Sequence, residues 1–175
     1  MKVIEQEIHS LKNSISEMWA LVHQQLYNAG EAMLTGDKEL AYKVISRERR
    51  VNAFELKIDS DCEDIIALYA PVAIDLRFVL AMYKINTNLE RLGDFAESIA
   101  RFAGNLPEGE PIDPQLVKET RVEEMLSELL SMISLTKEAF EKESSEIASR
   151  IFLKDNLIDE INHNSTAIIA KYIGA

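Results

Sequence analysis

The 175-residue chain is poor in cysteine, glycine and proline, and each shortage excludes a class of protein. Its one cysteine, Cys62, rules out an internal disulfide and any thiolate metal cluster. Six glycines and four prolines are too few for an all-β protein rich in turns. The apolar share of 47% is typical of a globular protein and too high for a disordered one.

Basic residues and long apolar runs are scarce too. The 19 Lys and Arg against 30 Asp and Glu give a formal net charge of −11. That balance disfavours binding to nucleic acid or to anionic lipid, since both need a basic surface. No apolar run approaches the roughly 18 residues of a membrane span, and the N-terminus lacks the apolar core of a signal peptide. We therefore expect a cytoplasmic protein that reaches a membrane only through partners.

The sequence also lacks the patterns typical of catalysis. It contains no Ser-His-Asp arrangement, no glycine-rich phosphate loop and no nucleophile elbow. We therefore do not expect an enzyme.

The spacing of apolar residues predicts an all-α fold. They recur at intervals of three and four throughout, and strict alternation is missing. We expect five helices, over residues 5–34, 38–69, 72–103, 113–142 and 145–173. Gly36 and Asp37 mark the first turn, Pro71 the second, and Ser144 with Ser145 the last. Long helices with short connections suit an elongated antiparallel bundle.

The second half of the chain repeats the first at an offset of 107 residues without a gap, so that Met18 aligns with Met125 and Leu26 with Ile133. This duplication predicts a first three-helix repeat over 1–104, a linker over 104–112 and a second repeat over 113–175. A counterpart of the third helix would begin beyond Ala175, so we expect the second repeat to hold two helices. Without that helix, an apolar surface of the second repeat stays uncovered, which predicts a homo-oligomer, specifically a dimer.

Polar residues lie where the core is expected. Four polar residues of the second helix share one stripe inside its apolar arc. They are spaced four, three and four residues apart: Glu48, Asn52, Glu55 and Asp59. On the third helix, Glu90 and Asp94 lie one turn apart on one face. Burying unpaired ionised carboxylates costs several kcal/mol or more, so this pattern requires compensation.

Three kinds of compensation are open from the residues alone. A multivalent hard cation is the first, because clustered carboxylates are its usual ligands. The second is an ion-pair network that uses Arg47, Arg49, Arg50, Arg77, Arg91 or Arg101. In the third, the helices splay apart and water reaches the stripe.

Three segments resemble motifs of the PhoU family of phosphate-signalling regulators. Residues 90–100, ERLGDFAESIA, resemble its E-R-[IL]-G-D-x-A-x-x-I signature. Residues 71–77, PVAIDLR, resemble its P-x-A-x-D-L-R helix start, and residues 51–59, VNAFELKID, its V-N-x-x-E-x-x-I-D segment. The three occur in family order and spacing. The resemblance implies two PhoU-type three-helix repeats, of which the second is incomplete here and lacks the sixth helix.

The resemblance also implies a metal site. Family members bind metal clusters through E/D-x-x-x-D motifs, which correspond here to Glu90 with Asp94 and Glu55 with Asp59. Glu48 keeps the acidic position four residues before Asn52. In the second repeat, Asp155 and Asp159 carry the motif over. The ion implied is iron, zinc, manganese or magnesium.

By the same resemblance, the expected function is negative control of high-affinity phosphate uptake and of phosphate-starvation signalling. The implied partners are a phosphate ABC transporter and a sensor histidine kinase. An alternative is a carboxylate metal-binding helical module that serves a different regulator or a sodium–phosphate symporter.

Overall fold

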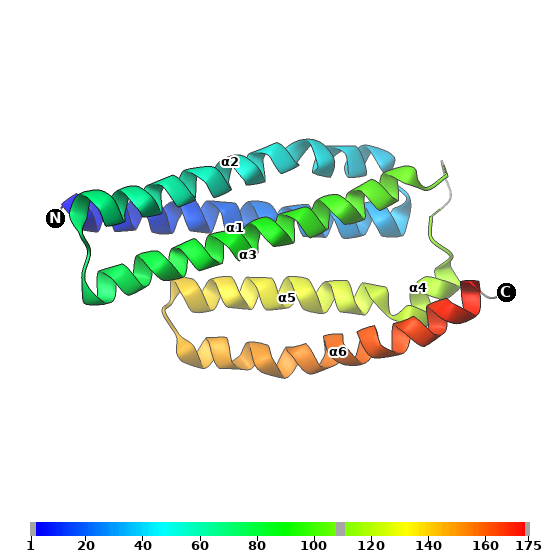
Figure 1. Cartoon of the computed structure of the whole chain (residues 1–175). Helices are drawn as coiled ribbons and strands as arrows, with labels where there is room; N and C mark the ends of the chain where they lie inside the picture. The colour runs from blue at the N-terminus through cyan, green and yellow to red at the C-terminus, as the bar shows by residue number, and fades with distance from the viewer. Residues whose placement is uncertain (1–2, 108–110, 174–175) are drawn as a thin grey trace.

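The computed structural model describes residues 3–107 and 111–173, which fold into six α-helices (Figure 1). In chain order they are α1 (Val3–Thr35), α2 (Lys38–Tyr69), α3 (Ala73–Asn105), α4 (Pro114–Thr120), α5 (Val122–Glu141) and α6 (Ser145–Ile173). The prediction of an all-α helical bundle is confirmed. None of the helices in these ranges combines the length and the apolarity that a membrane span requires.

The predicted number of helices, five, is wrong because the helix expected over 113–142 is divided at Arg121. The backbone of Arg121 is left-handed, with φ 55° and ψ 30°, and its N–H donates to the Lys118 carbonyl. The Thr120 hydroxyl donates to the Leu116 carbonyl one turn earlier, a bond that tends to bend helices. The additional helix, α4, is therefore the first part of the expected fourth helix. It is not a counterpart of α3, and no helix follows α6 in the described ranges.

The first three helices pack on one another as a bundle. Their shared core consists of apolar side chains spaced three and four apart. The members that are at most 2% exposed include Leu11, Ile15, Met18, Val22, Leu26, Val44, Val51, Ile58, Val79, Met82 and Leu89. Each such burial contributes about 1.5–3 kcal/mol, so the core fixes how α2 and α3 face each other.

The turns that join α1 to α2 and α2 to α3 lie at the residues that the sequence predicts. Gly36 has a positive φ of 72°, and the Asp37 carboxylate accepts a 2.9 Å bond from the Leu40 N–H at the start of α2. Pro71 lies between α2 and α3. Of the predicted linker 104–112, Gly104 and Asn105 still belong to α3, and residues 108–110 lie outside the described residues. The boundaries of the two repeats stay a prediction.

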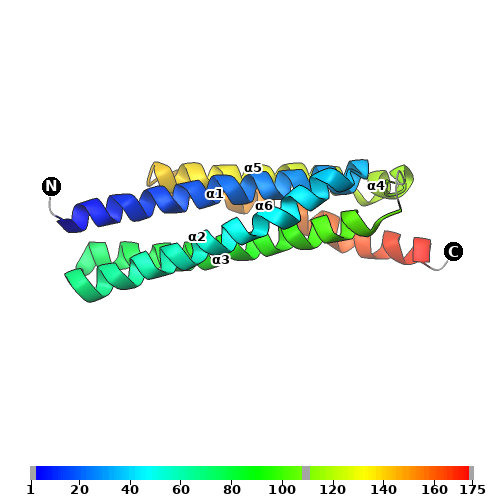
Figure 2. The ribbon, with the colours of Figure 1, turned by 90° about the horizontal axis from the view of Figure 1, so that it is seen from above.

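The second half packs against the first through α5 and α1. The Trp19 indole N–H donates to the Ile133 carbonyl at 3.2 Å, and its ring stacks on Phe140 with centroids 5.8 Å apart. Gly30 allows the close approach, since a Cβ there would lie 2.1 Å from Leu126 Cδ2. Figure 2 shows α1 and α5 in one layer, with α2 and α3 in the other.

The remaining helices complete the second half. α6 packs on α5 and α4, and the break between α5 and α6 falls where Ser144 and Ser145 predict it. The Ser144 hydroxyl accepts a 3.2 Å bond from the Ile147 N–H, so this side chain caps the new helix.

Candidate functional site

The acidic side chains of α2 and α3 gather along the seam between these helices. We call Glu48, Glu55, Asp59, Glu90 and Asp94 the acidic seam. Helical spacing explains the gathering, because residues three, four and seven apart share one face of a helix. Glu48 is buried, Glu55, Asp59 and Glu90 are half-buried, and Asp94 is exposed, so a shared interior groove for these five residues stays a prediction.

Asn86 joins the two helices within the acidic seam. Its buried amide donates a 2.7 Å bond to Asp59 Oδ1 and a 2.9 Å bond to the backbone carbonyl of Glu55. One amide thus fixes α3 against two consecutive turns of α2. Its own carbonyl oxygen has no partner among the described residues.

Glu48 is the most unusual member. Its side chain is 94% buried, and neither carboxylate oxygen has a hydrogen-bond partner among the described residues. Its pKa is raised from 4.5 to about 7, chiefly by burial and then by the neighbouring charges of Asp94, Glu97 and Glu90, in that order. A buried group with unsatisfied acceptors requires either a proton or a cation.

Glu90 has a related environment on α3. Burial raises its pKa first, followed by the charges of Asp94 and Glu55 and by a hydrogen bond to Asp94, while the charge of Arg91 lowers it. Two carboxyl groups share a hydrogen bond only if one of them holds a proton. Glu90 and Asp94 therefore form a pair that a cation is suited to bind in place of that proton.

Among the described residues no ion pair reaches the acidic seam, although the charge of Arg91 lowers the pKa of Glu90. None of the ion pairs formed by the described residues involves Glu48, Glu55, Asp59, Glu90 or Asp94. Of the arginines proposed as compensators, Arg101 pairs with Glu97 at 2.6 Å, and Arg50 lies over the Phe54 ring. The ion-pair interpretation is thus not supported, and water alone does not account for the buried Glu48.

Three predicted ligands lie elsewhere. Asn52 is exposed although its helical position matches the buried arc, because α1 and α3 cover the other side of α2. Asp155 and Asp159 are exposed on α6, which packs on α4 and α5. Across residues 3–107 and 111–173, no three Asp, Glu, His or Cys side chains already stand as a formed metal site. The metal assignment of all eight residues remains a prediction.

Sequence reasoning missed two residues of this region. Glu97 contributes to the raised pKa of Glu48, and Asn86 carries the hydrogen bonds between the helices. A signal for both exists: Asn86 precedes Glu90 by four residues and Glu97 follows it by seven, which places them on the same face of α3.

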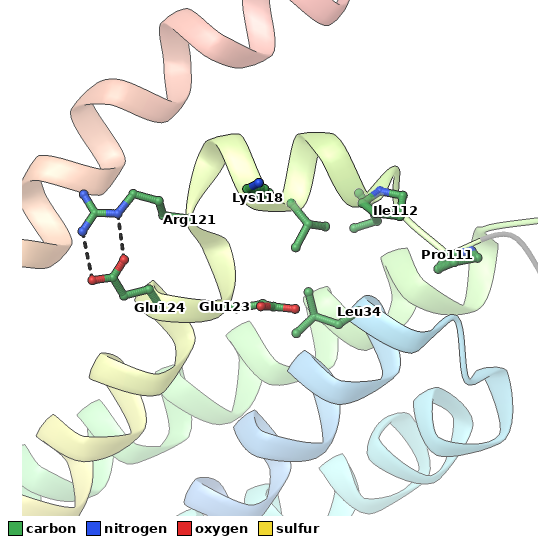
Figure 3. A pocket seen from close by; sticks show the side chains of 9 residues that line it. Leu34, Pro111, Ile112, Lys118, Arg121, Glu123 and Glu124 are labelled. Atoms are coloured by element: carbon green, nitrogen blue, oxygen red, sulfur yellow. Dashed lines mark hydrogen bonds and ion pairs between the residues drawn. The ribbon is translucent and has the colours of Figure 1, made fainter.

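A separate pocket of about 470 Å³ lies beside α4, far along the chain from the acidic seam (Figure 3). It is lined by Leu34, Pro111, Ile112, Pro114, Val117, Lys118, Arg121, Glu123 and Glu124. The Arg121 guanidinium is already engaged, because it pairs with Glu124 at 2.7 Å and with Glu160 at 2.9 Å. The pocket is therefore a weaker candidate for anion binding than its basic residues suggest.

The fold and the acidic seam together define a class: an all-α bundle of long helices in which carboxylates of α2 and α3 lie near enough to raise one another's pKa values. Comparison with known proteins identifies the family. The profile of the PhoU domain matches residues 15–103. A phosphate-specific transport system accessory protein PhoU homolog of Aquifex aeolicus is 33% identical over 169 residues, 95% of this chain and 74% of the relative. The Escherichia coli phosphate-specific transport system accessory protein PhoU is 34% identical over 88% of this chain and 62% of its own length.

Solved structures of PhoU proteins have the same fold as this chain. The phosphate transport system regulatory protein PhoU from Streptococcus pneumoniae superimposes with a TM-score of 0.82 at 30% identity, covering 95% of this chain and 77% of that protein. PhoU from Pseudomonas aeruginosa gives 0.85 at 26% identity, covering 97% and 79%. This chain belongs to the PhoU family.

Proposed function

We propose that this protein is a regulator of phosphate transport that acts as a PhoU-type accessory protein, without catalysis of its own. The observation that carries the proposal is the similarity to PhoU proteins over 95% of the chain, with the ERLGD segment on the acidic seam. It negatively controls high-affinity phosphate uptake and phosphate-starvation signalling from the cytoplasm. Its partners in this role are a phosphate ABC transporter and a sensor histidine kinase.

The proposal includes metal binding at the acidic seam. The residues present fit a hard cation: Glu48 has two buried oxygens without partners, and Glu90 shares a hydrogen bond with Asp94. Carboxylate and carbonyl oxygens are the preferred ligands of magnesium and manganese, and carboxylates also bind iron and zinc. Glu48, Glu55, Asp59, Glu90 and Asp94 are the residues that hold the ion. The bound charge offsets the mutual repulsion of these carboxylates and thereby ties α2 to α3.

Metal content tests the ligand assignment. The variant Glu90→Gln with Asp94→Asn keeps the shape of both side chains and removes their negative charge. We expect it to lose at least half of the iron, zinc, manganese or magnesium measured by elemental analysis after purification without chelator.

The matched control is Glu119→Gln with Glu123→Gln, two exposed glutamates also four residues apart. This control changes the net charge equally and should leave the metal content unchanged. Equal metal in the Glu90–Asp94 variant and the parent protein would refute the assignment.

Gene deletion tests the regulatory role. Loss of the protein is expected to raise expression of phosphate-starvation genes in high phosphate, and the restored gene should reverse this. Unchanged expression contradicts the role. If metal binding is confirmed while expression stays unchanged, the alternative gains support: a metal-binding module of another regulator or of a sodium–phosphate symporter.

A further inference from the structure

The outer side of α2 carries basic residues that the acidic seam does not use. Between residues 40 and 60 every exposed charged side chain is basic, although the whole chain has a formal net charge of −11. The three acidic residues of this segment, Glu48, Glu55 and Asp59, are buried or half-buried. The exposed basic residues are Lys43, Arg47, Arg49, Arg50 and Lys57. Together with the exposed Tyr42 and Leu56, we call them the basic face of α2.

Helical geometry places the two kinds of charge on opposite sides of α2. At about 100° per residue, the five basic residues fall between about 100° and 260° from Glu48, on the half of the helix turned away from it. The buried residues of α2, which include Val44, Glu48 and Val51, face α1 and α3. Figure 1 shows α2 as the outermost helix of its bundle, on the side opposite to α5 and α6. The basic face is therefore open to a partner.

Three arginines in the middle of the basic face have charges available to a partner. Arg47, Arg49 and Arg50 take part in no ion pair among the described residues. The Arg50 guanidinium lies 5.9 Å from the centroid of the Phe54 ring. That contact orients the guanidinium and leaves its charge without a carboxylate. An incoming carboxylate is the group that these side chains bind best.

Acidic residues limit the basic face at both ends. Lys43 pairs with Glu39 at 2.8 Å, and Lys57 pairs with Asp61 at 2.5 Å. The helix between the two lysines is roughly 21 Å long at 1.5 Å per residue. A nucleic acid or an anionic membrane would reach past this length onto acidic surface, which repels it. A short anionic segment of a protein fits the length.

The spacing within the basic face indicates that the bound segment is a helix. Two stripes run along α2 at intervals of seven residues: Tyr42, Arg49 and Leu56 form one, and Lys43, Arg50 and Lys57 form the other. Residues seven apart return to nearly the same side of a helix, so each stripe faces a helix lying alongside. Tyr42 is 60% and Leu56 is 69% exposed, which adds apolar contact to the first stripe. Tyr and Arg are also enriched at protein interfaces.

We propose that the basic face of α2 binds an acidic amphipathic helix of a partner protein. The bound helix is about 14 residues long at 1.5 Å per residue. Its Asp and Glu side chains pair with Arg47, Arg49 and Arg50, and its apolar residues contact Tyr42 and Leu56. This surface rests on the proposed function, since a regulator without catalysis acts through contacts with other proteins.

Peptide binding to the full chain gives the first test. One probe is a fluorescein-labelled alanine helix of 14 residues with four glutamates and two leucines on one side, and the other has glutamine in place of each glutamate. In fluorescence anisotropy at low salt, the glutamate peptide should bind with a Kd of roughly 10–100 µM. The glutamine peptide should bind at least tenfold more weakly. Added salt should weaken the glutamate peptide, because it screens exposed charges.

Charge reversal on the protein gives the second test. Arg47→Glu with Arg50→Glu should weaken binding of the glutamate peptide at least tenfold. Arg77→Glu with Lys84→Glu is the matched control, because it changes the net charge equally at two exposed residues of α3, and it should leave the Kd nearly unchanged. Far-ultraviolet circular dichroism shows whether each variant is folded, and the comparison of the two peptides on the parent protein requires no variant.

Three results overturn the proposal. The first is a parent protein that binds neither peptide, or both equally. The second is equal weakening by the two double variants. The third is a 20-base-pair DNA duplex, or vesicles of phosphatidylglycerol, that bind more tightly than the glutamate peptide and lose binding in the Arg47–Arg50 variant. That result assigns the basic face to a nucleic acid or a membrane.

Cells that carry Arg47→Glu with Arg50→Glu separate this surface from the proposed function. In high phosphate they should express phosphate-starvation genes as the deletion strain does, with unchanged amounts of the protein and of its metal. Normal repression in these cells, while gene deletion still has its effect, overturns the surface and leaves the regulatory role intact. If deletion itself has no effect, the regulatory role fails, and the peptide measurements alone decide whether the surface exists.

Discussion

The buried carboxyl of Glu48 makes the stability of the metal-free protein depend on pH. Its pKa rises from 4.5 to about 7, chiefly because of burial. At about 1.4 kcal/mol for each pH unit between those values, ionising Glu48 in the folded chain costs roughly 3 kcal/mol. That is a large part of the 5–15 kcal/mol that is typical of a whole domain.

The direction of the pH effect follows from the two pKa values. Below pH 4.5 Glu48 holds its proton in both the folded and the unfolded chain, so it has no effect. From pH 4.5 to about 7 the unfolded chain loses that proton first, and the free energy of unfolding falls as pH rises. Above pH 7 the loss stays at its full value.

Glu48→Gln removes this dependence, because the amide has nearly the same shape and no charge. Relative to the parent protein, the variant should gain roughly 2 kcal/mol or more in free energy of unfolding between pH 5 and pH 8. Urea unfolding followed by circular dichroism, after chelator treatment, measures the difference. Glu123→Gln, at an exposed position, is the control and should show no such gain. A constant difference between the Glu48 variant and the parent at every pH would falsify the reasoning.

Three further substitutions test the packing that holds the site. Gly93→Ala places a Cβ 2.8 Å from Val51 Cγ1 and should lower the free energy of unfolding by about 1–3 kcal/mol, whereas Gly104→Ala, with its nearest atom at 4.0 Å, should not. Asn86→Ala removes both bonds between α2 and α3 and should cost about 1–3 kcal/mol in thermal unfolding. Trp19→Phe removes the bond to the Ile133 carbonyl and should cost about 1 kcal/mol, measured as a lower urea midpoint.

The sequence predicts most helices well because their signals are local. The spacing of Leu11, Ile15 and Met18 defines the buried face of α1, and Gly36 with Asp37 defines its end. Arg121 shows the limit of this reasoning. Nothing local distinguishes it from other helical arginines, and its left-handed backbone accompanies an ion pair with Glu160, 39 residues away. The local Thr120 bond to Leu116 and the ion pair with Glu124 also occur in continuous helices, so neighbouring residues do not predict this break.

In the candidate site, too, helical spacing predicts the burial of some residues correctly and of others wrongly. Helical position predicts that Glu48 points toward the core, and the structure buries it. It also predicts burial for Asn52, which is exposed. A helical position gives the direction of a side chain but not how far the neighbouring helix extends over it. That extent depends on α3, whose placement is a tertiary property.

Glu48 and Asp155 separate the effect of the motif from the effect of the fold. They occupy the same position of the repeat, 107 residues apart, and each lies four residues before a polar partner, Asn52 or Asp159. Glu48 is 6% exposed and its pKa is raised, because α3 covers it and brings Asp94, Glu97 and Glu90 near. Asp155 is exposed on α6, where no helix of the described chain provides that cover. A carboxylate stripe on one helix is therefore only half of a cation site, and the second helix supplies both the low-dielectric cover and the additional negative charge. The carboxylates of α2 and α3 thus have the cover and the clustered charge that the predicted metal site requires, whereas Asp155 and Asp159 on α6 have no such cover among the described helices.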